Sequence, residues 1–157
     1  MYSSSSIEDL NENFTQLCNC FYIERFAVAK ISDKQNLSLL KENKFEIFDT
    51  YPKEWMDMYV KKKFYEFDPV YKLIDQSYLP QTWHVNDFIN ISEKERKFFE
   101  IASNFSICSG TTIHIKNNDA STVYFTSVDR IIYHPEVLYI LSHAIRIYGS
   151  VACVLKK

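Results

Sequence analysis

The chain has 157 residues, a formal net charge of -2 and 16% aromatic residues. This length suits a single domain over residues 1–157, and the weak negative charge argues against nucleic-acid binding by this chain alone. No segment resembles a signal peptide, none is apolar enough to span a membrane, and the four cysteines form no C-x-x-C pair, so we expect a cytoplasmic protein without a membrane partner.

The first part of the chain predicts one helix and two strands. Ser6 is a typical helix N-cap, and the apolar residues that follow repeat at helical spacing, which predicts a buried face made of Leu10, Phe14, Leu17 and Phe21. Residues 26–31 and 45–48 are rich in β-forming side chains and predict two strands, with a polar loop at 32–43 between them.

Aromatic residues then concentrate between Tyr51 and Trp83. Pro52 suits the first turn of a helix, where a missing N–H has no cost, and Trp55 and Tyr59 fall one turn apart on its face. A second helix is expected to start at the Asp68-Pro69 pair and to bury Val70, Leu73 and Ile74. This stretch is predicted to form one wall of a small-molecule pocket.

The rest of the chain predicts a helix, a hairpin and a long last helix. A capping box at 92–95 opens a helix that buries Phe98, Phe99 and Ala102. Strands at 107–115 and 121–128 flank a polar turn. The helix from about 135 to 155 has more apolar residues than one packing face needs, which favours either a dimer surface or burial on several sides. About five strands and a hairpin indicate an α+β fold with an antiparallel sheet.

The aromatic stretch resembles the autoinducer-binding domain of LuxR-type quorum-sensing receptors. The family pattern is Tyr-Pro-x-x-Trp, a Tyr four residues later, then Asp-Pro, and a Trp fifteen residues after the Asp, and the chain matches every position. The match continues through Phe98-Phe99-Glu100-x-Ala102, Gly110 with Thr112, and Thr126, so it covers roughly residues 20 to 155. It implies an α-β-α sandwich with a roughly five-stranded antiparallel sheet, and a receptor for N-acyl-homoserine lactones.

The resemblance also implies which residues bind the ligand. Trp55 would donate its indole N–H to the lactone carbonyl, Asp68 would accept from the amide N–H, and Tyr51, helped by Thr126, would donate to the amide carbonyl. An indole only donates and an ionised carboxylate only accepts, so these roles cannot be exchanged. The remaining contacts would be apolar: Trp83, Phe98 and Ala102 around the lactone ring, and Tyr59 and Tyr71 beside the acyl chain.

Each of these residue types has a common structural alternative. An Asp before Pro is often a helix N-cap, a Trp in an aromatic stripe often belongs to the core, and a Thr such as Thr126 is an ordinary β-former. The spacing of the whole motif favours the ligand-binding interpretation for Asp68.

Catalytic, metal-binding and cofactor-binding patterns are missing from the sequence. The four histidines lack metal-ligand spacing, Cys108-Ser109-Gly110 is not a nucleophile elbow, and no glycine-rich phosphate-binding loop is present. We therefore expect neither an enzyme nor a metal or cofactor site.

Three departures from the family pattern stand out. Ser106 occupies a position that is usually Gly, and His114 or its neighbour occupies one that is usually Pro. The chain also ends after its last helix, where family receptors continue into a helix-turn-helix domain. Two functions are open: a sensor that binds a lactone-like signal and forms a homodimer, or an interaction module that forms a heterodimer with a full-length LuxR-type receptor and inhibits it.

Overall fold

The structure is a computed structural model of the chain, and it describes residues 5–23, 25–31, 46–73, 79–116, 121–127 and 134–155. The predicted loop at 32–43, the hairpin turn at 117–119 and Ile74 lie outside these residues. The helices are α1 (Ile7–Cys20), α2 (Lys53–Lys61), α3 (Pro69–Lys72), α4 (Glu93–Ser103) and α5 (Pro135–Leu155), with 3₁₀ turns at Phe64–Glu66 and Val85–Asp87. No helix in the described ranges has the length and apolarity needed to cross a bilayer.

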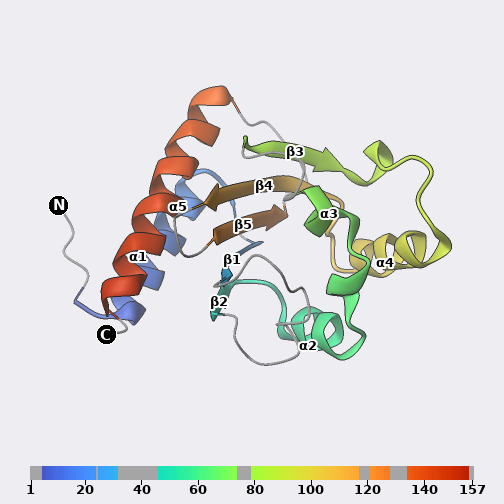
Figure 1. Cartoon of the computed structure of the whole chain (residues 1–157), viewed down its shortest axis with the longest axis horizontal. Coiled ribbons are helices and arrows are strands. Elements are labelled where there is room, and N and C mark those ends of the chain that lie inside the picture. Colours follow the sequence, from blue (N-terminus) through green and yellow to red (C-terminus); the bar gives the residue numbers. More distant parts are fainter. Residues whose placement is uncertain are drawn as a thin grey trace.

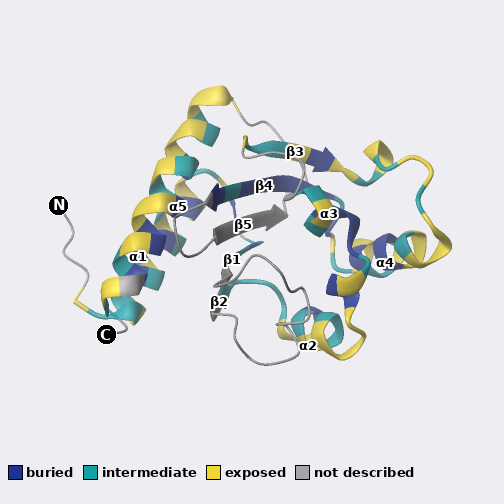
Figure 2. Cartoon of the chain, viewed as in Figure 1, coloured by how far each residue is buried: buried dark blue, intermediate teal, exposed yellow. Residues whose placement is uncertain are grey.

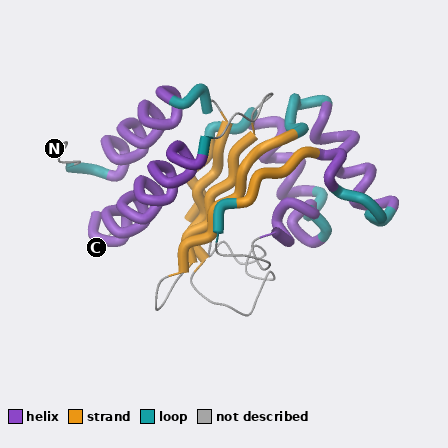
Figure 3. The backbone as a smooth tube through the Cα atoms, turned by 90° about the horizontal axis from the view of Figure 1, so that it is seen from above, coloured by secondary structure: helices purple, strands orange, loops and turns teal. Residues whose placement is uncertain are grey.

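The strands β1 (Arg25–Ile31), β2 (Glu46–Asp49), β3 (Gln81–His84), β4 (Ser109–Lys116) and β5 (Ser121–Ser127) form an antiparallel sheet in the order β2-β1-β5-β4-β3. The hairpin expected from residues 107–128 is present as β4 and β5. Helices cover both faces of this sheet, with α1 and α5 on one side and α2, α3 and α4 on the other (Figures 1 and 3). The predicted α+β class is confirmed.

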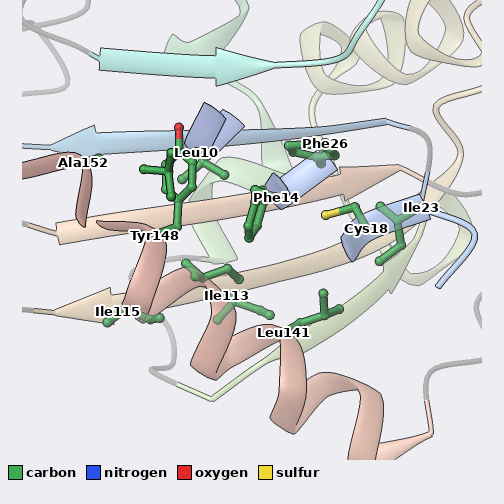
Figure 4. Close-up of a cluster of buried hydrophobic side chains, with 12 residues drawn as sticks. Leu10, Phe14, Cys18, Ile23, Phe26, Ile113, Ile115, Leu141, Tyr148 and Ala152 are labelled. Carbon is green, nitrogen blue, oxygen red and sulfur yellow. The ribbon is translucent and has the colours of Figure 1, made fainter. Parts of the chain in front are cut away.

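The α1–α5 side of the sheet holds the first hydrophobic core (Figure 4). Leu10 and Phe14 of α1 are buried there, as predicted, but the next residue of the stripe is Cys18, which is fully buried, and not Leu17. Both positions suit a helical period, and the i, i+4, i+8 row is the one that faces the sheet. The hydroxyl of Tyr148 on α5 donates to Asn11 Oδ1 on α1 at 2.6 Å, which joins the two helices.

Helix α4 begins and ends with defined caps. Ser92 and Glu95 form the predicted capping box, with Ser92 N–H donating to Glu95 Oε2 at 2.7 Å. At the other end, Ile107 N–H donates to the Ala102 carbonyl at 3.0 Å, and Ser106 lies in the left-handed region with φ 57°. Helices that end in this geometry usually have glycine at the left-handed position. The backbone conformation therefore explains why the family has glycine here, and Ser106 adopts the same conformation with some steric strain.

Replacing Ser106 with glycine is expected to stabilise the fold. A side chain in the left-handed region costs about 1–2 kcal/mol, of which the greater chain entropy of glycine takes back part, so Ser106→Gly should raise the free energy of unfolding by about 1 kcal/mol. Asn104→Gly is the matched control, because Asn104 is helical with φ -65° and gains nothing from glycine. Urea unfolding should show a gain for the first variant and a loss for the second; changes of the same sign would contradict the strain at Ser106.

Candidate ligand-binding site

The second hydrophobic core lies on the α2–α4 side of the sheet and is built largely of rings. We call it the aromatic cluster; its buried members are Trp55, Phe64, Val70, Trp83, Phe98, Phe99, Ala102 and Ile107. Trp55 of α2 is 4% exposed and stands at its centre, with ring centroids 5.9 Å from Phe64, 5.9 Å from Phe98 and 5.4 Å from Phe105. Pro52 is the N-cap of α2, one residue before the helix begins, and the predicted pair of Trp55 and Tyr59 is in contact at 5.8 Å.

Asp68 brings a carboxylate to the edge of these rings. The residue is 7% exposed and caps α3, with Oδ1 accepting from Val70 N–H at 2.8 Å. Its other oxygen, Oδ2, accepts from the Tyr59 hydroxyl at 2.8 Å. The capping role that the Asp-Pro pair suggested is therefore present.

The surroundings of Asp68 shift its acidity. Burial raises the pKa of the carboxyl from 3.8 to about 6, against the lowering effects of the Tyr59 hydroxyl and of backbone N–H groups. Burial, together with the charge and hydrogen bond of Asp68, holds the pKa of Tyr59 well above its usual value, so Tyr59 stays a donor. At neutral pH the site thus contains a buried, charged acceptor.

Tyr51 and Tyr71 lie close enough to join this polar group. Each adds a smaller upward contribution to the pKa of Tyr59. Tyr51 also packs against the aromatic cluster, and Tyr71 is half-buried on α3, next to the capped end at Asp68. Three tyrosine side chains and one carboxylate therefore lie within electrostatic reach of one another.

The predicted ring-packing residues come from two further elements. Phe98 and Ala102, one turn apart on α4, are 3% and 0% exposed, and Trp83 on β3 is 4% exposed. All three belong to the aromatic cluster. An ion pair of 2.6 Å between Lys72 Nζ and Glu95 Oε1 joins α3, which Asp68 caps, to α4, which carries Phe98.

Thr126 is a predicted site residue whose side chain the structure does not describe. It lies on β5, where the structure describes the backbone and not the side chains. Thr126 pairs with Phe26 of β1, which packs in the α1–α5 core, and directly paired residues share a face. Thr112, 3% exposed, lies two residues from Gly110, the partner of Trp83, and so on the opposite face, the one that the aromatic cluster covers.

Phe64 is the main residue of this site that the sequence interpretation missed. It is 4% exposed and contacts the rings of Trp55, Tyr59 and Phe98. The available signal was the pair of phenylalanines at 64 and 67, whose spacing places both on one side of a 3₁₀ turn; their rings are 5.7 Å apart.

The geometry agrees with what comparison with known proteins finds. Residues 6–144 match the profile of the autoinducer binding domain, which is more than half of the 157 residues. The chain belongs to this LuxR-type family. The family resemblance inferred from the sequence motif is thereby confirmed.

Relatives of this autoinducer-binding domain include transcriptional activators. TraR of Rhizobium radiobacter is 36% identical over 77 residues, which is 48% of this chain and 33% of TraR. CarR of Pectobacterium carotovorum subsp. carotovorum is 29% identical over 79 residues, which is 49% of this chain and 32% of CarR. The matched part of the chain thus spans about a third of the length of these relatives.

Solved structures show the same fold at lower identity. Escherichia coli SdiA has a TM-score of 0.79 and 16% identity, over 98% of this chain and 63% of SdiA. A second SdiA structure, in complex with octanoyl-rac-glycerol, has a TM-score of 0.73 and 15% identity, over 96% and 60% of the two chains. CepR2 of Burkholderia cenocepacia, described as N-acylhomoserine lactone dependent, has a TM-score of 0.64 and 15% identity, over 97% and 86%.

The raised pKa of Asp68 predicts how the stability of the autoinducer-binding domain depends on pH. Between about pH 4 and pH 6 the folded state holds a proton that the unfolded chain has lost, so the free energy of unfolding falls as pH rises through this window. At about 1.4 kcal/mol for each unit of pKa, the loss over the whole titration is on the order of 3 kcal/mol.

The measurement is urea unfolding of the parent and of Asp68→Asn across this window. The difference in stability between the two proteins should move in favour of the variant as pH rises. Glu95 gives a control of opposite sign. Hydrogen bonds from Lys72 and then from Ser92 lower the pKa of Glu95 from 4.5 to about 2. The contribution of Glu95 to the free energy of unfolding is therefore lost as pH falls below about 4.5. A stability difference between parent and Asp68→Asn that does not change with pH would contradict the shifted carboxyl.

Proposed function

We propose that this chain is the sensor domain of a quorum-sensing regulator, and that it binds an N-acyl-homoserine lactone or a related acyl signal against the aromatic cluster beside Asp68. The observation that carries the proposal is the buried carboxylate of Asp68, held by Tyr59 at the edge of a wall of rings. A buried charge is costly unless it is paired, and such groups concentrate at functional sites.

Asp68 is the proposed acceptor for the amide N–H of the signal. Each carboxylate oxygen can accept two hydrogen bonds, and the Tyr59 hydroxyl uses one of the two at Oδ2. A ligand amide would replace part of the hydration that burial removed. Tyr59 is then a positioning residue as well as a neighbour of the acyl chain, because its hydroxyl orients the carboxylate.

The other proposed contacts follow from the remaining chemistry of an acyl signal. The Trp55 indole N–H would donate to the head-group carbonyl and the Tyr51 hydroxyl to the amide carbonyl. The ring of the head group would pack against Trp83, Phe98 and Ala102, and the acyl chain would run beside Tyr59 and Tyr71. Thr126 remains a predicted helper of Tyr51, although its place in the register favours Thr112 as the hydroxyl on this face.

Two structural relatives support an acyl compound with a polar head as the ligand class. CepR2 is described as N-acylhomoserine lactone dependent, and one SdiA structure holds octanoyl-rac-glycerol. The two head groups differ, whereas an acyl chain is common to both. A non-enzymatic sensor role also agrees with the transcriptional activators among the relatives.

Thermal unfolding with a panel of acyl compounds tests the proposal. A ligand at 100 times its dissociation constant adds about 2.7 kcal/mol of stability, which for a chain of this size raises the melting temperature by roughly 5–10 °C. N-acyl-homoserine lactones of several chain lengths and octanoyl-rac-glycerol form the panel; homoserine lactone without an acyl chain, and the free fatty acid, are the controls. No shift with any acyl compound would refute a sensor of this class.

A second role is favoured by the outer face of α5, which carries exposed apolar side chains. Such a face suits a homodimer. It also suits a heterodimer in which this chain, with or without a bound ligand, inhibits a full-length LuxR-type receptor.

A further inference from the structure

The indole N–H of Trp83 is a buried donor that has no hydrogen-bond acceptor in the described part of the chain. The whole residue is 4% exposed and lies on β3 within the aromatic cluster. Nearly all buried N–H groups in folded proteins find an acceptor, because an unsatisfied donor loses its bond to water and gains none in return. The Trp83 N–H therefore lacks an acceptor among the residues that the structure describes, and a bound ligand could provide one.

The residue directly opposite Trp83 is Gly110 of β4, and it has no side chain to fill the neighbouring position. The chain contains only two glycines, and neither has a positive φ. The backbone at Gly110 therefore follows an ordinary strand path that any residue could adopt. Glycine in a strand interior commonly marks a close approach of a ligand or another backbone, and side chains directly opposite each other start only about 5 Å apart.

The unsatisfied N–H and the missing side chain occur at one register position, on the face that the aromatic cluster covers. From this juxtaposition we infer that Trp83 is a second indole donor, which binds an oxygen of the signal's head group placed over Gly110. The inference rests on the proposed function and narrows it: the head group must carry a second acceptor oxygen, such as a hydroxyl or a ring ester oxygen, besides the oxygen bound by Trp55. Trp83 then selects among head groups and does not only pack against them.

Nuclear magnetic resonance can observe this donor directly, because the chain has only two tryptophans and so only two indole N–H signals. Three probes with the same octanoyl chain differ in their head groups: octanoyl-rac-glycerol and N-octanoyl-homoserine lactone have the extra oxygen, and N-octanoyl-2-aminocyclopentanone keeps the ring carbonyl for Trp55 but lacks the extra oxygen. Trp83→Phe assigns the signals, and Trp55→Phe does so independently if the first variant does not fold.

The first two probes should move the Trp83 indole proton downfield and slow its exchange with solvent, and the cyclopentanone probe should not. Trp83→Phe should weaken the binding of the first two probes about fivefold to tenfold, the effect of one neutral hydrogen bond, and should weaken the binding of the cyclopentanone probe less. A saturating probe that shifts the signal of Trp55 and leaves that of Trp83 unchanged would overturn this inference and keep the sensor function. If none of the probes binds, both fail.

Discussion

Asp68→Asn should reduce the affinity for an N-acyl-homoserine lactone by about 10-fold to 100-fold at neutral pH, while the protein stays folded. A hydrogen bond to a charged acceptor contributes about 1.5–3 kcal/mol, against about 1 kcal/mol for a neutral pair, and 1.4 kcal/mol corresponds to tenfold in affinity. The asparagine can still cap α3 through its carbonyl oxygen. The asparagine NH₂ group takes the place of one carboxylate oxygen. A donor, and no longer an acceptor, then faces either the Tyr59 hydroxyl or the ligand N–H.

Tyr51→Phe is the comparison variant, because it removes a neutral donor from the same group and should cost only about fivefold. Calorimetric titration of both variants with one lactone decides the order of the effects. Asp68→Asn should also be more stable than the parent without ligand at neutral pH, since it removes a buried charge whose pKa is raised. An Asp68→Asn protein that binds the lactone like the parent would show that the carboxylate serves only as a cap.

Charging the outer face of α5 should separate two dimer subunits without unfolding either one. The inner face of this helix is fully buried at Leu141 and Ile145, whereas Ile147 is 61% exposed and Val154 is 70% exposed. Figure 2 shows exposed residues along the outer side of the helix. Ile140, 44% exposed, lies on the same stripe two helical turns before Ile147. This face is the proposed contact between two copies of the chain, or between the chain and a LuxR-type receptor.

Ile147→Glu and Ile145→Glu form a matched pair on this helix. In a two-fold symmetric interface each substitution occurs twice, and an unpaired buried charge costs several kcal/mol. Ile147→Glu should therefore raise the dimer dissociation constant at least about 100-fold, while the helical circular dichroism signal stays the same. Ile145→Glu buries a charge in the α1–α5 core and should unfold the chain. Sedimentation velocity tests the first part: a parent that is monomeric at high concentration would refute the dimer.

Sequence spacing predicted the elements that local chemistry determines. The capping box at Ser92, the β4–β5 hairpin and the long last helix depend on neighbouring residues, and all three are present. The motif also placed Trp55, Trp83 and Phe98 in one cluster, because its spacing is that of a known fold.

Contacts between distant segments were harder to predict. The hydrogen bond from Tyr59 to Asp68 joins α2 to the start of α3, and the segment between them contains a 3₁₀ turn that the sequence analysis did not predict. The assignment of Thr126 depends on strand register, where a shift of one residue reverses the face. Whether Leu17 or Cys18 is the buried residue depends on which side of α1 packs against the sheet. The local sequence does not determine that side.

The position of the ligand is the central claim, and photo-crosslinking measures it most directly. An N-acyl-homoserine lactone with a diazirine in its acyl chain would be activated on the protein, and the modified peptides would be identified by mass spectrometry, with excess unlabelled lactone as the competitor. The account predicts competed labelling within residues 51–73 and 81–112, the segments that supply Asp68 and the aromatic cluster. Labelling confined to α1 and α5, on the other face of the sheet, would contradict it.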